Sequence, residues 1–263
     1  MKNQVEFMVR GKLALFTDPL TKIGGEKCSY HIPTYEALKG VAKSVYWKPT
    51  FTWIIDKVRV LMPIRTQAKN VKPVNYSGVY PSMKDPSKKK EKSFHTLSIY
   101  TYLLDVEYQV QAHFEWNLFR QDMAKDRIDG KHWDIAKRMI EKGGRQDVFL
   151  GTRECQGYVE PCVFGEGQGH YDAAGELAYG IMFHGFDYPD ETGKTDEDGK
   201  PDASGEYRLH ARFWRPTMVN GAVTFLRPED CTIRKFVREM TPNPPKSNGL
   251  QEPVLIAEME VQS

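Results

Sequence analysis

The chain has 263 residues, of which 40% are hydrophobic and 27% are charged, and this composition excludes a chain that is disordered throughout. No run of about 18 apolar residues occurs, so the sequence offers no membrane-spanning segment. The formal net charge of +2 hides an asymmetry, because residues 1–150 carry 26 Lys and Arg against 16 Asp and Glu, whereas residues 151–263 carry 11 against 19. The basic first part favours a polyanionic partner.

Hydrophobic periodicity predicts a strand, a helix and a second strand at the start of the chain. Apolar and polar residues alternate over 4–16, as in a strand. A helix is expected at about 34–47, because its apolar residues fall on one face and Pro33 precedes them. Alternation resumes over 51–62. The next segment, 65–93, has eight basic and two acidic residues and three prolines, and we interpret it as a basic insertion between two strands.

The middle of the chain predicts two more strands and a second helix. Strands are expected over 94–104 and 106–117. Strict alternation in the latter is typical of a half-buried antiparallel strand and places His113 on its polar, exposed face. A polar loop over 118–130 then leads to a helix at about 131–142, which a pair of glycines ends.

A further strand at 147–152 completes the order βαββαβ, which is the ferredoxin-like arrangement. Additional strands are expected at 177–187, 206–215 and 217–226, the last with Asn220-Gly221 as a hairpin turn. We therefore expect an α+β fold in three parts. These are a ferredoxin-like domain over 1–155 with the basic insertion at 65–93, a smaller antiparallel β-rich domain over 156–240, and an extended tail over 241–263.

The cysteines Cys28, Cys155, Cys162 and Cys231 show no CxxC pair and no tight spacing. This pattern argues against a zinc site and against a disulfide framework. A reducing cytoplasm is the expected compartment. We expect neither a metal nor another cofactor.

Candidate catalytic residues gather at one loop-to-helix junction, Gly130-Lys131-His132. A helix N-terminus offers free N–H groups to a phosphate, a lysine can neutralise an oxyanion, and a histidine with a pKa of about 6.5 can transfer protons at neutral pH. A lone Lys-His pair is nevertheless more often structural than catalytic. Tyr46 is a second candidate, for which a core position beside Trp47 is the commoner role.

Several segments resemble the CRISPR-associated Cas family five of the type I-C (Dvulg) subtype, a branch of the RAMP superfamily. They are ALFTDPLTKIGGEKCSYHIPTYEALKGVAKSVYWKPT (14–50), GKHWDI (130–135), FLGTRECQGYVEPC (149–162), HGFDYPDETG (184–193) and RPEDC (227–231). The match runs in the right order over most of the chain. It implies a ferredoxin-like domain followed by a smaller β-rich domain, and an endoribonuclease that cleaves CRISPR repeat hairpins in precursor RNA. The family's tyrosine, lysine and histidine map onto Tyr46, Lys131 and His132.

The implied reaction is a metal-independent attack of a ribose 2′-OH on the adjacent phosphate, which leaves a 2′,3′-cyclic phosphate and a 5′-OH. His132 suits an acid or a base, Lys131 would stabilise developing negative charge, and Tyr46 suits an acid or a positioning group. The implied partners are the repeat RNA, whose 5′ handle the protein would retain, and the backbone and large subunits of the type I-C surveillance complex. Candidate RNA contacts are Lys22, Lys27, Arg120, Arg127, Lys137, Arg138 and Arg145.

Two alternatives stay open at this point. The same fold and charge would serve a non-catalytic subunit that caps the 5′ handle of the guide RNA. A weaker alternative is a protein of the same immune system that binds or cuts DNA. Cleavage of labelled repeat RNA in EDTA discriminates the first alternative, and a 2′-deoxy nucleotide at the cut site discriminates the second.

Overall fold

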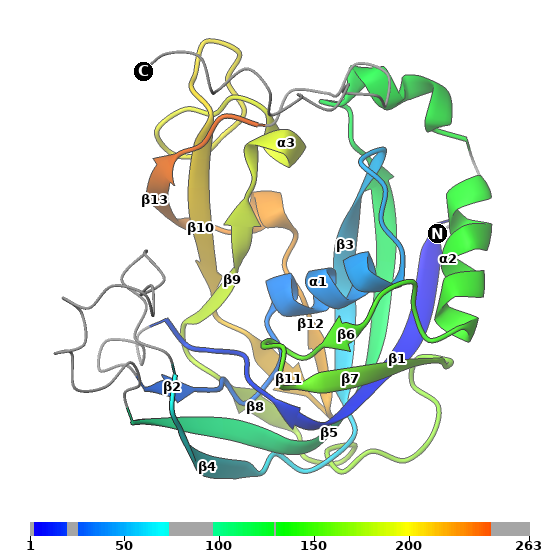
Figure 1. The fold of residues 1–263 in the computed structure, drawn as a ribbon, viewed down its shortest axis with the longest axis vertical. Helices are drawn as coiled ribbons and strands as arrows, with labels where there is room; N and C mark the ends of the chain where they lie inside the picture. Colours follow the sequence, from blue (N-terminus) through cyan, green and yellow to red (C-terminus); the bar gives the residue numbers. More distant parts are fainter. Residues whose placement is uncertain (1–2, 20–25, 74–96, 129, 243–263) are drawn as a thin grey trace, which may run out of the picture.

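The computed structural model describes residues 3–19, 26–73, 97–128 and 130–242 (Figure 1). The described chain mixes α and β structure, with a mostly antiparallel sheet and few helices, so the predicted class is confirmed at this level. No helix within these ranges is long and apolar enough to cross a membrane.

The main sheet has the strand order β6-β7-β1-β5-β3-β12-β11-β8, and β2 and β4 also pair with β5. Its strands are β1 (Gln4–Ala14), β2 (Lys27–Cys28), β3 (Phe51–Val60), β4 (Thr66–Val71), β5 (Ser98–Trp116), β6 (Val148–Phe149), β7 (Gln156–Pro161), β8 (Glu176–Ala178), β11 (Thr217–Val219) and β12 (Ala222–Thr224). Apart from β2 with β5, the paired strands run antiparallel. The central position of β5 makes it the common partner of β1, β2, β3 and β4.

A smaller sheet has the order β13-β10-β9, made of β9 (Met182–Asp187), β10 (Arg208–Trp214) and β13 (Ile233–Glu239). In the chain, the short helix α3 (Pro189–Thr192) lies between β9 and β10, and the 3₁₀ helix η4 (Pro228–Asp230) precedes β13. Because β7, β8, β11 and β12 belong to the main sheet while β9, β10 and β13 form their own, the chain after residue 155 contributes to both sheets. The domain boundary at residue 155 stays a prediction.

Two helices cover the main sheet, and the first of them begins just after Pro33, as the sequence predicts (Figure 1). In α1 (Tyr35–Val45), the side chain of Thr34 accepts a hydrogen bond from the backbone N–H of Ala37 at 3.2 Å, which caps the helix. Its buried face packs on β3. The second helix, α2 (Lys131–Glu141), starts after Gly130 at a φ of 79° and packs on β1 and β7. Both helices fall within the predicted ranges.

Several sequence-based expectations need correction. The strands expected at 94–104 and 106–117 are one strand, β5, which passes residue 105 with a single left-handed residue, Asp105 at a φ of 46°. Part of the expected insertion, Thr66–Val71, is a strand because its backbone pairs with β5. Residues 74–93 of that insertion and 243–263 of the expected tail lie outside the described residues.

Among the remaining expectations, one turn is confirmed, whereas the expected bounds of one strand and the expected exposure of His113 are wrong. The Asn220-Gly221 turn is confirmed, with φ angles of 47° and 81° between β11 and β12. The strand expected at 177–187 is interrupted and becomes β8 and β9, and β13 was not predicted at all. His113 is not exposed: its residue is 4% accessible, and its Nδ1 lies 2.8 Å from a carboxylate oxygen of Asp56.

Candidate active site

Tyr46 is held by the end of α1 in a defined position. The residue leaves the helix with extended backbone, and its N–H still donates to the carbonyl of Ala42. Its own carbonyl accepts a 2.7 Å hydrogen bond from the indole of Trp53. Its ring packs against Phe51 with centroids 5.6 Å apart. These contacts fix the direction in which the phenol points.

His132 lies in the first turn of α2, and its side chain is completely buried. Its ring contacts those of Phe51, Phe114 and Trp116, at centroid distances of 5.3, 6.3 and 5.7 Å. The Nδ1 atom lies 2.8 Å from the hydroxyl oxygen of Tyr46. Two segments separated by 86 positions therefore bring a phenol and an imidazole into direct contact.

Lys131 precedes His132 but occupies a different environment. Its side chain is 43% exposed and forms an ion pair with the carboxylate of Asp126. The structure thus brings Tyr46 and His132 together directly, while Lys131 is linked to them through Asp126.

Asp126 is a residue of the site that the sequence does not single out, because it lies in the segment 118–130, which was expected to be a polar loop. It ends the 3₁₀ helix η3 (Gln121–Asp126), in a loop read as irregular. Its carboxylate accepts a 2.8 Å hydrogen bond from the hydroxyl of Thr50, and its backbone carbonyl lies 2.8 Å from His132 Nε2. The only signal in the sequence was its position five residues before Lys131, because contact through a backbone carbonyl leaves no pattern of residue types.

The electrostatics of this cluster favour an ionised carboxylate and a neutral phenol. The hydrogen bond from Lys131 lowers the pKa of Asp126, and the hydrogen bond from Thr50 acts in the same direction. Burial raises the pKa of Tyr46, and the negative charge of Asp126 raises it further, while Arg145 opposes the shift. Tyr46 therefore carries its proton at neutral pH.

The predicted RNA contacts divide into two groups. Three of them are engaged within the protein. The Lys27 ammonium lies 4.7 Å from the centroid of the Tyr100 ring, Arg120 forms an ion pair with Asp122, and Arg127 donates to two backbone carbonyls of its own loop. Three others, Lys137, Arg138 and Arg145, are exposed on or just after α2, although Lys137 also contacts the Trp133 ring and Arg138 donates to a backbone carbonyl of its own helix. Lys22 lies outside the described residues, and the RNA-binding role of all seven stays a prediction.

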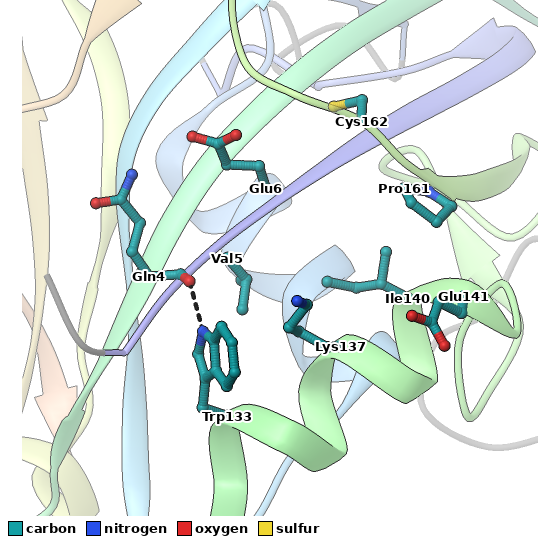
Figure 2. A pocket seen from close by; sticks show the side chains of 9 residues that line it. All are labelled: Gln4, Val5, Glu6, Trp133, Lys137, Ile140, Glu141, Pro161 and Cys162. Atoms are coloured by element: carbon teal, nitrogen blue, oxygen red, sulfur yellow. Dashed lines mark hydrogen bonds between the residues drawn. The ribbon is translucent and has the colours of Figure 1, made fainter. Parts of the chain in front are cut away.

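A cavity of about 440 Å³ lies between α2, β1 and the end of β7 (Figure 2). Trp133 forms one wall and donates from its indole N–H to the carbonyl of Gln4 at 2.8 Å. The ammonium of Lys137 lies 4.6 Å from the centroid of the same indole ring. The cavity therefore adjoins the helix that carries His132, and the Trp133 hydrogen bond ties that helix to β1.

Metal-ligating side chains are scattered in the described parts of the chain. Within them, no group of three or more His, Cys, Asp or Glu residues is placed to hold a metal ion.

Comparison with known proteins gives a consistent result. The family model described as CRISPR-associated protein (Cas_Cas5) matches residues 5–226. A relative from Mannheimia succiniciproducens, named CRISPR pre-crRNA endoribonuclease Cas5d, is 30% identical over 165 residues, which cover 59% of this chain and 70% of the relative. A relative of the same name from Thermus thermophilus is 27% identical over 162 residues, which cover 60% of this chain and 64% of the relative.

Solved structures agree with the family match. One, described as a CRISPR-associated protein, has a TM-score of 0.66 at 33% identity and covers 88% of this chain and 96% of its own. A functionally uncharacterized protein from Streptococcus mutans has a TM-score of 0.64 at 35% identity, with the same coverage of both chains.

Proposed function

The chain belongs to the Cas5 family of CRISPR-associated proteins, and from this premise we propose that it is an endoribonuclease that cleaves precursor CRISPR RNA. Its relatives from two bacteria carry the name of that activity. The observation that carries the proposal is the 2.8 Å contact between Tyr46 Oη and His132 Nδ1. Lys131 is the residue that precedes His132 in the sequence. Its substrate is a repeat hairpin, and the protein then retains the 5′ handle as a subunit of the type I-C surveillance complex.

The reaction follows from the chemistry of these three side chains. Attack of a 2′-OH on the adjacent phosphate needs a proton acceptor at the 2′-oxygen and positive charge near the phosphorane. A phenol bonded to an imidazole can move a proton, and the exposed Lys131 ammonium can approach the phosphate. Cleavage by this route requires no metal and leaves a 2′,3′-cyclic phosphate and a 5′-OH.

The fold supports the same assignment. The elements β1, α1, β3, β5, α2 and β7 follow the order βαββαβ, and their strands lie side by side as β7-β1-β5-β3 with antiparallel pairing. This order and pairing support our proposal that these elements form a ferredoxin-like domain and that this domain is the RNA-binding core. The proposal includes a cytoplasmic location.

Cleavage of end-labelled repeat RNA in EDTA tests the proposed function. We expect the wild-type protein to cut and His132→Ala to lose cutting, because no other group then accepts the Tyr46 proton. Its affinity for the hairpin should stay within about threefold, since the buried imidazole adds nothing to the phosphate contacts that dominate binding. His170→Ala, which removes an exposed histidine, is the matched control and should cut at the wild-type rate.

A non-catalytic subunit that caps the guide is the second candidate, and one observation favours it. His132 is completely buried, and both of its ring nitrogens already have partners within the protein. A wild-type protein that binds the hairpin tightly but gives no product over hours in EDTA would support this candidate and contradict the first.

A further inference from the structure

Asp126 holds three side chains of the candidate active site at once. Its carboxylate forms the ion pair with Lys131 and accepts the hydrogen bond from Thr50. Its backbone carbonyl lies 2.8 Å from His132 Nε2, and a carboxylate oxygen lies 3.4 Å from the same nitrogen. The Asp126 side chain is 30% exposed, whereas the His132 side chain is fully buried. The carboxylate is therefore in contact with both solvent and the imidazole.

These contacts determine which nitrogen of His132 carries the proton. A carbonyl oxygen can only accept a hydrogen bond, so Nε2 must be the donor to Asp126. In the neutral imidazole Nδ1 is then unprotonated and can only accept. Its partner, the hydroxyl of Tyr46 at 2.8 Å, must be the donor. The proton of Tyr46 thus points towards His132, and the lone pairs of its oxygen are left for another donor.

We propose that Tyr46, His132 and Asp126 form a proton relay in which Asp126 is the positioning residue. This inference rests on the proposed ribonuclease function and assigns its base. The ribose 2′-OH gives its proton to the oxygen of Tyr46, while the proton of Tyr46 passes to His132 Nδ1. The electron pair of the 2′-oxygen forms the new bond to phosphorus, the bond from phosphorus to the 5′-oxygen breaks, and that oxygen takes a proton from water.

The relay explains why His132 is fully buried at a site that must meet RNA. In the relay the imidazole need not touch the substrate, because Tyr46, itself only 3% exposed, takes the ribose proton and passes its own to Nδ1. When Nδ1 gains the proton, the imidazolium donates from Nε2 to the carbonyl of Asp126 and lies beside its carboxylate. A buried cation stabilised by a fixed carboxylate follows the same logic as the orienting acid of a Ser-His-Asp triad.

Asp126→Asn removes the negative charge and keeps the shape, the backbone carbonyl and an acceptor for Thr50. We expect the single-turnover rate to fall roughly tenfold to a hundredfold, which is the range of one charge-assisted hydrogen bond. Affinity for an RNA with a 2′-deoxy nucleotide at the cut site should stay within about twofold. Asp122→Asn is the matched control, because Asp122 lies in the same 3₁₀ helix and pairs with Arg120 instead.

Two further measurements separate the relay from a merely structural role. In a Tyr46→Phe background, Asp126→Asn should cause no additional loss of the residual rate, whereas in a Lys131→Ala background the loss should persist. Nitrogen NMR of the wild-type protein should find the His132 proton on Nε2, and this result does not depend on how the variants fold. A proton on Nδ1, or Asp126→Asn cutting at the wild-type rate, would overturn the relay. A wild-type protein that does not cut at all would instead overturn the proposed function.

Discussion

His184 is a buried histidine whose environment excludes a second proton. It stacks on Tyr35 with ring centroids 4.2 Å apart, its Nδ1 accepts from the guanidinium of Arg212 at 3.4 Å, and its Nε2 lies 3.0 Å from the carbonyl of Leu226. Burial, followed by the charge of Arg212, lowers its pKa to about 3. The folded protein therefore keeps this imidazole neutral where an unfolded chain does not.

This difference predicts an acid-sensitive fold. The unfolded chain takes up a proton near pH 6.5, while the folded His184 does so only near pH 3, so the free energy of unfolding should fall as pH drops through that window. Between pH 7 and pH 5 the contribution is about 2 kcal/mol. Urea unfolding at both pH values should show a smaller loss for His184→Gln than for wild type, and an unchanged loss for His170→Gln. Equal losses in wild type and His184→Gln would contradict the assignment.

At the scale of elements, a buried arginine ties a glycine-rich loop to the main sheet. Arg59 on β3 bonds both carboxylate oxygens of Asp172 at 2.7 and 2.9 Å, the carbonyls of Glu166 and Gly167 at 3.0 and 2.9 Å, and the side chain of Gln109 on β5 at 3.1 Å. The planar guanidinium serves these partners because it presents five donors in a fixed plane. Arg59 thus contacts three residues of the loop over 163–175, which Gln109 also holds by accepting from the N–H of Gly165 and donating to the carbonyl of Glu166.

Arg59→Lys should therefore destabilise the fold, although the substitution keeps the positive charge. A single ammonium cannot reach all these acceptors, and we expect the free energy of unfolding to fall by about 2–3 kcal/mol. Arg10→Lys is the control, because the Arg10 and Glu160 side chains are 54% and 42% exposed and such pairs contribute little. Its effect should stay within about 0.5 kcal/mol. Urea denaturation measures both, and equal small effects would contradict the role of Arg59.

The sequence predicts an element well when the pattern of its own residues determines it. It predicts an element poorly when pairing with a distant strand determines it. Both long helices are predicted by local signals: an apolar face and a preceding proline for α1, and a terminating pair of glycines for α2. The strand β4 does not, because its basic, polar sequence becomes a strand only by pairing with β5. The strand β13 was missed because Ile233, Phe236 and Val237 remain exposed and give no alternating pattern.

The same distinction applies to the candidate site. His132 is a candidate by its position at a loop-to-helix junction and Tyr46 by its residue type, but a structural role is commoner for both, and only the family resemblance groups them in one site. Asp126 acts partly through its backbone carbonyl, so only the fold reveals it. Residue type can identify acids, bases and cations in a sequence, but it cannot identify which carbonyl will face which ring.

At the scale of the whole molecule, the excess of positive charge in residues 1–150 predicts salt-dependent RNA binding. Each phosphate contact adds about 0.7–0.9 to the slope of log affinity against log salt concentration. Replacing Lys137, Arg138 and Arg145 together by alanine should lower that slope by about 2–3. The control variant replaces three exposed cations of the second half of the chain, Lys200, Lys235 and Arg238. Equal slopes in the two variants would show that the RNA lies elsewhere.

The topology of the main sheet also constrains when the protein can acquire its structure during synthesis. The central strand pairs Val5 with Ala112, and the neighbouring β3 pairs Val58 with Val223. A nascent chain on the ribosome cannot begin the sheet before β5 starts to emerge at Ser98, because β1, β2, β3 and β4 all pair with β5. It cannot cover the free edge of β3 before Thr224 has followed. Contacts this distant in sequence form slowly, and an uncovered strand edge invites pairing with other chains. The first half of this protein therefore leaves the exit tunnel before all the strands that complete its sheet have been made.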